Sequence, residues 1–98
     1  MAEKKLSVIN MLENVSCSAR IGDYAEAALS FNHCTIELNK IIQTLVSDQQ
    51  KQNHLKKITY SLQTLLLMLK NEDWVAIADI IDYELIPLLD NAFKSNDI

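Results

Sequence analysis

Glycine and proline are almost missing from this chain, and their scarcity restricts its fold more than any other feature. The 98 residues contain one glycine, Gly22, and one proline, Pro87. A β-rich fold needs several turns built from these residues, so we do not expect one here. Apolar residues instead recur at intervals of three and four, which is typical of amphipathic helices. We therefore predict an all-α fold in which residues 1–98 form a single domain.

The apolar pattern divides into four segments joined by short connections. Gly22 is suited to end the first helix in the left-handed conformation, while Asp23 and Asp73 are suited to cap the second and fourth helices. Short connections make neighbouring helices antiparallel. This predicts an antiparallel four-helix bundle with up-down-up-down topology, whose helices cover about residues 4–20, 24–46, 54–70 and 73–93.

Each segment has an apolar stripe that we assign to the bundle core. The predicted core positions are Val8, Ile9, Leu12, Val15, Ala19, Tyr24, Ala27, Ala28, Phe31, Thr35, Leu38, Ile42, Leu45, Leu55, Ile58, Leu62, Leu65, Leu66, Leu69, Trp74, Ile77, Ala78, Ile81, Leu85, Leu88 and Ala92.

A faint internal repeat relates the two halves of the chain. A shift of fifty residues places Asp23-Tyr24 on Asp73-Trp74, and Ala28 on Ala78. In both halves a helix ends, an aspartate caps, and an aromatic residue opens the next helix. Two stacked helical hairpins would produce this pattern, and convergent patterning of bundle helices would produce it about as well.

Charge and hydropathy exclude two classes of partner. The net charge is −4 and basic residues are adjacent only in two pairs, Lys4-Lys5 and Lys56-Lys57, whereas nucleic-acid binding needs a basic stripe that contacts phosphates. The longest apolar run, 65–69, is far shorter than the roughly 20 residues that span a bilayer. We expect no nucleic-acid partner and no membrane insertion.

Cys17 and Cys34 are the only cysteines. The first twenty residues have the pattern of a helix rather than of a signal peptide. Reduced thiols are then the expected state, because disulfides belong mainly to exported proteins. We predict a cytoplasmic location.

The last predicted helix carries a second apolar stripe beside its core stripe. We propose a protein interface there, formed by Val75, Asp82, Ile86, Leu89 and Phe93. The alternative is a wide arc that faces the core, with Asp82 reaching solvent or a lysine, since an unpaired buried carboxylate would be costly. Asp79, Tyr83 and Asp90 fall on the opposite, solvated side.

Pro87 lies inside this same helix. Its ring crowds the Tyr83 carbonyl and its missing N–H leaves that carbonyl without a partner, so we predict a kink between about 83 and 87. Such a kink would curl the last turns over the end of the bundle, or else form a hinge.

Catalytic and metal-binding patterns are weak. Di-metal bundle sites need Glu-x-x-His pairs, and neither histidine has an acid three residues before it. We expect no metal, no cofactor, no small-molecule substrate and no enzymatic activity. The alternative function is a histidine phosphotransfer bundle using His33, although Ile36 and Glu37 replace the basic and small residues that such a site needs.

Several apolar side chains point away from the predicted core. They are Tyr60 and Leu67 in the third segment, with Met68 on another side, and Leu29 and Ile36 in the second. Isolated exposed apolar residues are ordinary, whereas a cluster would mark an interface.

The stretch "DWVAIADIIDYELIPLLD" resembles the closing helix of a small uncharacterised family from endospore-forming Gram-positive bacteria. The resemblance covers the last quarter of the chain and implies no activity. A looser similarity, in size and helicity alone, is to flagellar export chaperones. The matching positions are Asp73, Trp74, Ala78, Asp79, Asp82, Tyr83, Glu84, Leu85 and Pro87.

These observations favour a non-catalytic module for protein interaction or self-association, with an adaptor-like or chaperone-like role. Its partner would be another protein or a second copy of the chain in a homodimer.

Overall fold

The computed structural model describes residues 2–94, and the side chains of residues 7–93 within them. This part of the chain is helical apart from its connections and contains no strand, so the all-α prediction is confirmed. Met1 and residues 95–98 of the predicted domain lie outside it. The helices are α1 (Ala2–Arg20), α2 (Tyr24–Val46), α3 (Gln52–Lys70), α4 (Trp74–Ile80) and α5 (Ile86–Lys94).

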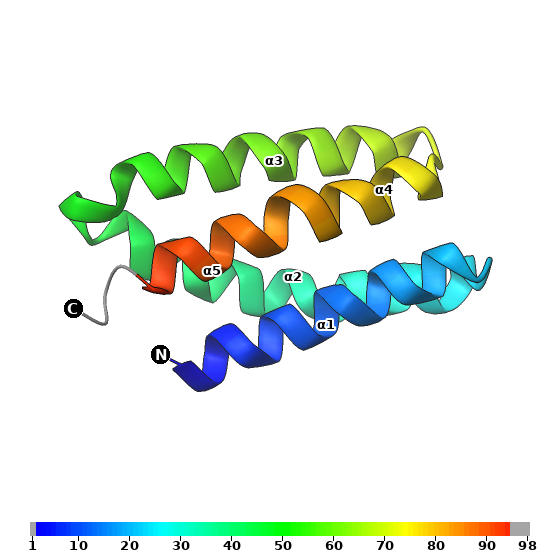
Figure 1. The fold of residues 1–98 in the computed structure, drawn as a ribbon, viewed down its shortest axis with the longest axis horizontal. Coiled ribbons are helices and arrows are strands. Elements are labelled where there is room, and N and C mark those ends of the chain that lie inside the picture. The colour runs from blue at the N-terminus through cyan, green and yellow to red at the C-terminus, as the bar shows by residue number, and fades with distance from the viewer. Residues whose placement is uncertain (1, 95–98) are drawn as a thin grey trace.

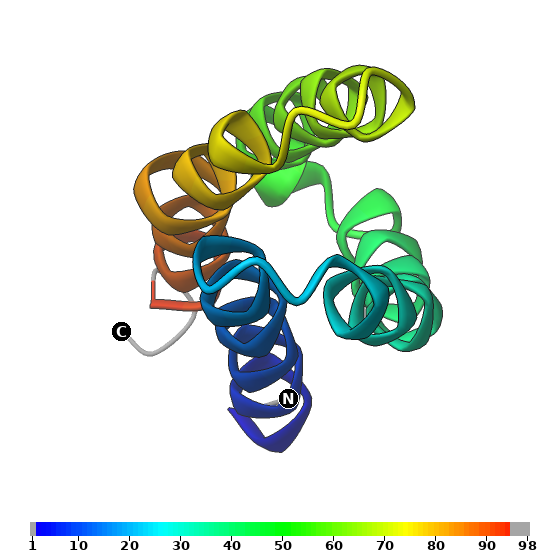
Figure 2. The same cartoon turned by 90° about the vertical axis from the view of Figure 1, so that its right-hand side faces the viewer.

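Two short elements complete the chain. A 3₁₀ turn, η1 (Gln49–Lys51), precedes α3, and a π-helical turn, η2 (Ile81–Leu85), joins α4 to α5. The segments α4, η2 and α5 follow one another along a single helical path that lies between α1 and α3 in Figure 1. Seen along the helices, α1, α2, α3 and the α4–α5 path surround a shared core (Figure 2). The elongated molecule, 39 × 23 × 20 Å, is compatible with a four-helix bundle.

The two helix–helix turns at one end of the molecule have the same geometry. The Asp23 carboxylate accepts a hydrogen bond from the Glu26 N–H at 3.2 Å, and the Asp73 carboxylate accepts one from the Ala76 N–H at 3.1 Å. Both predicted caps are therefore confirmed. Gly22 has the expected positive φ of 84°, and Glu72 occupies the equivalent position with a φ of 55°.

The internal repeat is visible in the helix boundaries as well as in these turns. Both ends of α3 (Gln52–Lys70) lie fifty residues after the ends of α1 (Ala2–Arg20). The backbone bond from Asp23 N–H to the Ser18 carbonyl recurs from Asp73 N–H to the Met68 carbonyl, each at 2.9 Å. The turn that joins α1 to α2 therefore matches the turn that joins α3 to α4.

The core agrees with most of the predicted stripes, and the exceptions lie mainly on α2 and α3. Thr35 and Leu66 are exposed, and Tyr24 keeps 49% of its surface accessible. Ile41 and Ser61 are instead buried. A helical wheel ranks positions around one helix, whereas burial depends on which neighbour covers each side. Because α2 packs more sparsely on α3 than on α1, the edge of each stripe along that corner stays open.

A π-helical turn precedes Pro87, in the region where the sequence predicts a kink. The Ile86 N–H donates to the Ile81 carbonyl, five residues back. Widening the helix in this way accommodates a proline ring that would clash with the carbonyl of Tyr83 in a regular α-helix. The last turns continue beside α1 and α3 as α5, so the prediction that they curl over the end of the bundle is wrong.

Lys51 is a buried charge near the other end of the molecule. Its side chain is 4% exposed and its ammonium group donates a hydrogen bond to the Ala92 carbonyl in α5. A buried charge is tolerable when it is hydrogen-bonded in this way. The contact ties η1 to the last helix.

Candidate functional site

The predicted interface on the last helix does not form one surface. Leu89 and Phe93 are 1% and 5% exposed and belong to the core, so they are not available to a partner. Ile86 is half-buried against the core, and Val75 is 71% exposed. The assignment of Leu89 and Phe93 to an exposed interface was wrong, and the alternative of a wide arc facing the core describes this helix better.

The π-helical turn explains the error. A π-helix has more residues per turn than an α-helix, so each residue within η2 advances by a smaller angle. Positions after the turn are rotated relative to a regular wheel. The predicted core residue Leu88 is consequently only half-buried, and its neighbour Leu89 takes the fully buried place.

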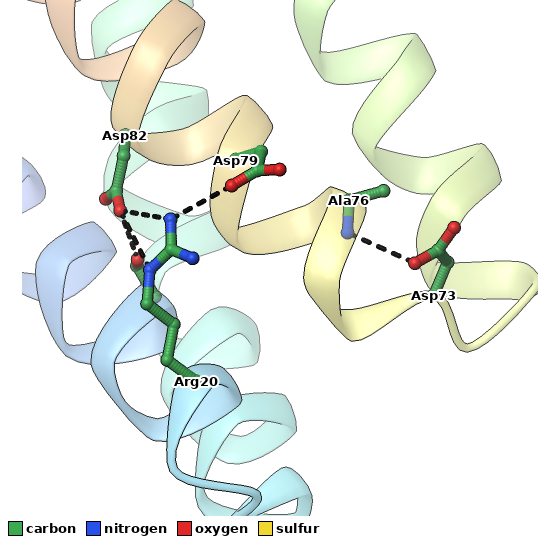
Figure 3. Close-up of polar contacts among 6 residues, drawn as sticks. Arg20, Asp73, Ala76, Asp79 and Asp82 are labelled. Carbon is green, nitrogen blue, oxygen red and sulfur yellow. Dashed lines mark hydrogen bonds and ion pairs between the residues drawn. The ribbon is translucent and has the colours of Figure 1, made fainter.

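Asp82 has an intramolecular partner. Its Oδ2 accepts hydrogen bonds from the Ser16 hydroxyl at 2.8 Å and from Arg20 Nη2 at 2.8 Å, with Arg20 Nε at 3.3 Å (Figure 3). The same Nη2 donates to Asp79 Oδ1 at 3.1 Å. These bonds, first to Asp82 and then to Asp79, raise the pKa of the Arg20 guanidinium further, so it remains charged. Asp82 thus links α1 to η2.

Asp79 was placed among side chains that are simply solvated, and that description was incomplete. Its side chain is 51% exposed and is paired with Arg20, also in Figure 3. Tyr83 is exposed as expected, whereas Asp90 is half-buried. The wheel could not reveal the Asp79 pair, because the partner comes from α1.

A groove lies between α3 and the later part of the α4–α5 path. Lys56, Lys57 and Tyr60 line it from α3, and Tyr83 and Glu84 line it from η2. Its volume is about 490 Å³, and Pro87, Leu88 and Asn91 of α5 complete the wall. We call this feature the tyrosine groove.

The two tyrosines are among the most exposed large hydrophobic residues of the part of the chain whose side chains are described. Tyr60 is 71% and Tyr83 is 75% accessible, so neither ring is used by the core. The outward direction of Tyr60 was predicted and is confirmed. Tyr83 was interpreted as a solvated group. Lys56-Lys57 is one of two adjacent lysine pairs in the sequence, and nothing in the sequence indicates that it lines the same groove as the two tyrosines.

The other outward apolar residues do not join this groove. Leu29, Ile36 and Leu67 are 52%, 60% and 53% exposed, and none of them lines it. A smaller apolar groove of about 180 Å³ lies along the α2–α3 corner, where Phe31 and Leu66 contribute to its walls. The exposed apolar surface is therefore divided among separate places.

His33 is exposed on α2, as predicted, and borders a polar groove between α1 and α2. In this groove the Asn14 amide donates to the Ser30 hydroxyl at 2.6 Å, and Ser30 donates to Glu26 at 3.2 Å. The lining includes Glu26 and no lysine or arginine, so the groove provides no positive charge to hold a phosphoryl group.

The two cysteines are not bonded to each other. Cys17 is exposed, whereas Cys34 is fully buried in the core. Burial, and secondarily the negative charge of Glu37, raises the pKa of the Cys34 thiol to about 12. Cys34 therefore acts as a small apolar filler and stays protonated at neutral pH.

No group of three or more histidine, cysteine, aspartate or glutamate side chains within the described residues is arranged to hold a metal ion. In the same part of the chain, none of the helices combines the length and apolar character needed to cross a bilayer.

The architecture and the groove define a class of protein: a small all-helical bundle with a solvent-facing, aromatic-lined groove. The chain belongs to the family described as "Domain of unknown function (DUF8042)", which matches residues 6–95. No curated protein and no solved structure matches this chain.

Proposed function

We propose that this chain is an up-down-up-down four-helix bundle that acts as a non-catalytic protein-binding module, in an adaptor-like or chaperone-like role. The observation that carries the proposal is the tyrosine groove, with Tyr60 and Tyr83 exposed on its two sides. Tyrosine is enriched in protein interfaces and their hot spots, because its rigid ring buries much area at a low entropic cost.

The groove favours a partner other than a flat protein surface. The groove is concave, with a volume of about 490 Å³. A single chain segment can enter such a cleft. The partner is therefore another protein, and a second copy of this chain is the alternative.

The cellular location that we propose is the cytoplasm. Cys17 and Cys34 are both free, and Cys17 is exposed to whatever redox conditions surround the protein. Free thiols are usual in reducing compartments.

Site-specific photo-crosslinking tests the binding function. A benzophenone amino acid would replace Tyr83 in one variant and Ile36 in another, in the native cells. Ile36 is 60% exposed and lies on α2, away from the groove, so it is a matched control. We expect a defined protein crosslinked at position 83 and not at position 36.

The captured protein would then be purified and its binding to the unmodified chain measured. Tyr83→Ala should weaken binding by more than about tenfold, as expected for a hot-spot residue. A product containing two copies of this chain would establish self-association instead. Failure to crosslink at position 83, together with a monomeric mass by light scattering, would contradict the proposal.

A phosphotransfer function for His33 is the second candidate, and its support is the exposure of the imidazole on α2. Incubation with phosphoramidate followed by mass spectrometry tests it. Because the surrounding groove contains Glu26 and no basic residue, we expect no phosphorylation at His33 above that of denatured chain. Stable modification that disappears in His33→Gln would reverse this ranking.

A further inference from the structure

The tyrosine groove differs in charge from the rest of the chain. It is lined by two lysines, Lys56 and Lys57, and by one acid, Glu84, whereas the whole chain has a net charge of −4. A local positive excess on an acidic protein attracts negatively charged partners and orients them during encounter. The charge of the lining thus indicates that the groove favours negatively charged partners.

The ammonium groups of the groove are available. Among the described residues, Arg20 and Lys40 form ion pairs and Lys51 donates to a buried carbonyl, while Lys56 and Lys57 form no ion pair. Both are exposed. A carboxylate that enters the groove can therefore pair with them without breaking an existing contact.

The remaining lining supplies apolar contact. Tyr60 lines the groove from α3 and Tyr83 lines it from η2, and Pro87 and Leu88 of α5 add to the lining. Such surfaces hold aliphatic, proline or aromatic side chains by area burial. Since exposed ion pairs contribute little affinity, the apolar contacts would supply most of the binding and the lysines would select the partner.

The shape of the groove disfavours an identical copy as the occupant. In a two-fold dimer the same patch meets itself. Two concave grooves facing each other would enclose an unfilled space, which forfeits packing contacts. A single protruding segment avoids this problem.

We propose that the tyrosine groove binds a short acidic segment of a partner protein, with apolar side chains between Tyr60 and Tyr83 and carboxylates paired with Lys56 and Lys57. This inference rests on the proposed function, because it specifies the partner chemistry for the same groove.

The test is selection from a random linear peptide library displayed on phage, using the full chain as bait. Three baits would be compared: the unmodified chain, the charge reversal Lys56→Glu/Lys57→Glu, and the matched reversal Lys40→Glu/Lys70→Glu outside the groove. Both double variants change the net charge equally. Circular dichroism would establish that each bait is folded.

We expect the unmodified chain and the Lys40→Glu/Lys70→Glu control to enrich peptides with excess Asp and Glu. The groove reversal should weaken those peptides by at least about fivefold, as two exposed ion pairs would, and should enrich basic peptides instead. Tyr60→Ala/Tyr83→Ala should abolish binding of peptides from either selection, measured by fluorescence anisotropy.

Enriched peptides without an acidic excess, or indifferent to the groove reversal, would overturn the inference. So would the absence of any enriched peptide, or binding that survives loss of both tyrosines. If position 83 still crosslinks to a protein in cells, the binding function stands and only the acidic preference fails. If it does not, both fail.

Discussion

The ring of Tyr24 stacks on the ring of Trp74, with centroids 5.2 Å apart and planes only 9° from parallel. Each residue opens a helix directly after its capping aspartate, α2 after Asp23 and α4 after Asp73. These residues are equivalent in the fifty-residue repeat, so the stack connects the two turns that the repeat relates. It joins the beginnings of helices that otherwise pack mainly against α1 and α3.

Disrupting the stack should reveal direct coupling between the hairpins. In a double-mutant cycle of Tyr24→Ala and Trp74→Ala, we expect a coupling energy of about 0.5–1.5 kcal/mol, the range for aromatic pairs. Urea unfolding followed by circular dichroism measures it. A cycle of Trp74→Ala with Tyr60→Ala, an exposed tyrosine on α3, should be additive. Additivity in both cycles would refute the energetic link.

The two matching turns predict that glycine is the favoured residue at both position 22 and position 72. Gly22 has a φ of 84°, and a Cβ there would meet nothing within 4 Å, so Gly22→Ala is penalised by backbone conformation alone. We expect a loss of about 1 kcal/mol in unfolding free energy. Glu72, with a φ of 55°, already bears this strain, so Glu72→Gly should be neutral or stabilising. Equal destabilisation by both changes would contradict this account.

The caps in these turns should also contribute separately. Asp23→Ala and Asp73→Ala each remove a side-chain acceptor for a helix N–H, from Glu26 and Ala76 respectively. The typical loss is about 1 kcal/mol for each. Asp23→Asn and Asp73→Asn keep an acceptor and should preserve most of the stability in denaturant titrations.

Asp82 is expected to affect stability without affecting association. Asp82→Leu removes the acceptor of the Ser16 hydroxyl, which is 3% exposed, and a buried unsatisfied group costs about 1–3 kcal/mol. Asp79→Leu should lower the melting temperature less, because Arg20 retains Asp82. Size-exclusion chromatography with light scattering should show an unchanged mass for both. A change in mass for Asp82→Leu would restore the interface hypothesis.

Leu85 provides a reference for core packing. It is 0% exposed, so Leu85→Ala should cost roughly 2–5 kcal/mol. Phe93→Ala should resemble it, since Phe93 is 5% exposed. Val75→Ala, at 71% exposure, should stay within about 0.5 kcal/mol of the unmodified chain. A near-neutral effect of Phe93→Ala would show that this side chain faces solvent rather than the core.

The cysteines should react at very different rates. In the native chain at neutral pH, Ellman's reagent should modify Cys17 and leave Cys34 protected, with both reacting after denaturation. The raised pKa of Cys34, about 12, also predicts a pH effect on stability. Above the ordinary thiol pKa of about 9 the unfolded chain loses this proton and the folded chain keeps it. Unfolding therefore becomes easier as pH rises, by an amount that Cys34→Ala should remove.

Local signals were sufficient for the elements of this fold. The spacing of apolar residues, the single Gly22 and the two aspartate caps predicted the helices, and their boundaries agree closely with the observed ones. Each of these signals acts within one turn of helix or one connection. They therefore do not depend on how distant parts of the chain pack.

The candidate site was much less predictable. Pro87 indicated a distortion, but its accommodation as a π-helical turn depends on how η2 and α5 pack on α1 and α3. That turn changed which residues of the last helix face the core, and so removed Leu89 and Phe93 from the proposed interface. A wheel with a constant angle per residue cannot anticipate such a change.

The sequence by itself determined the all-helical class, the places where helices start and stop, and the equivalence of the two hairpin turns, since hydrogen bonds and periodicity over a few residues decide them. Only the tertiary structure paired Asp82 with Arg20 and placed Tyr60 and Tyr83 in the lining of one groove. Those contacts join residues far apart in the chain. They exist only once each helix has a fixed rotation and a fixed neighbour, which a single helix does not encode.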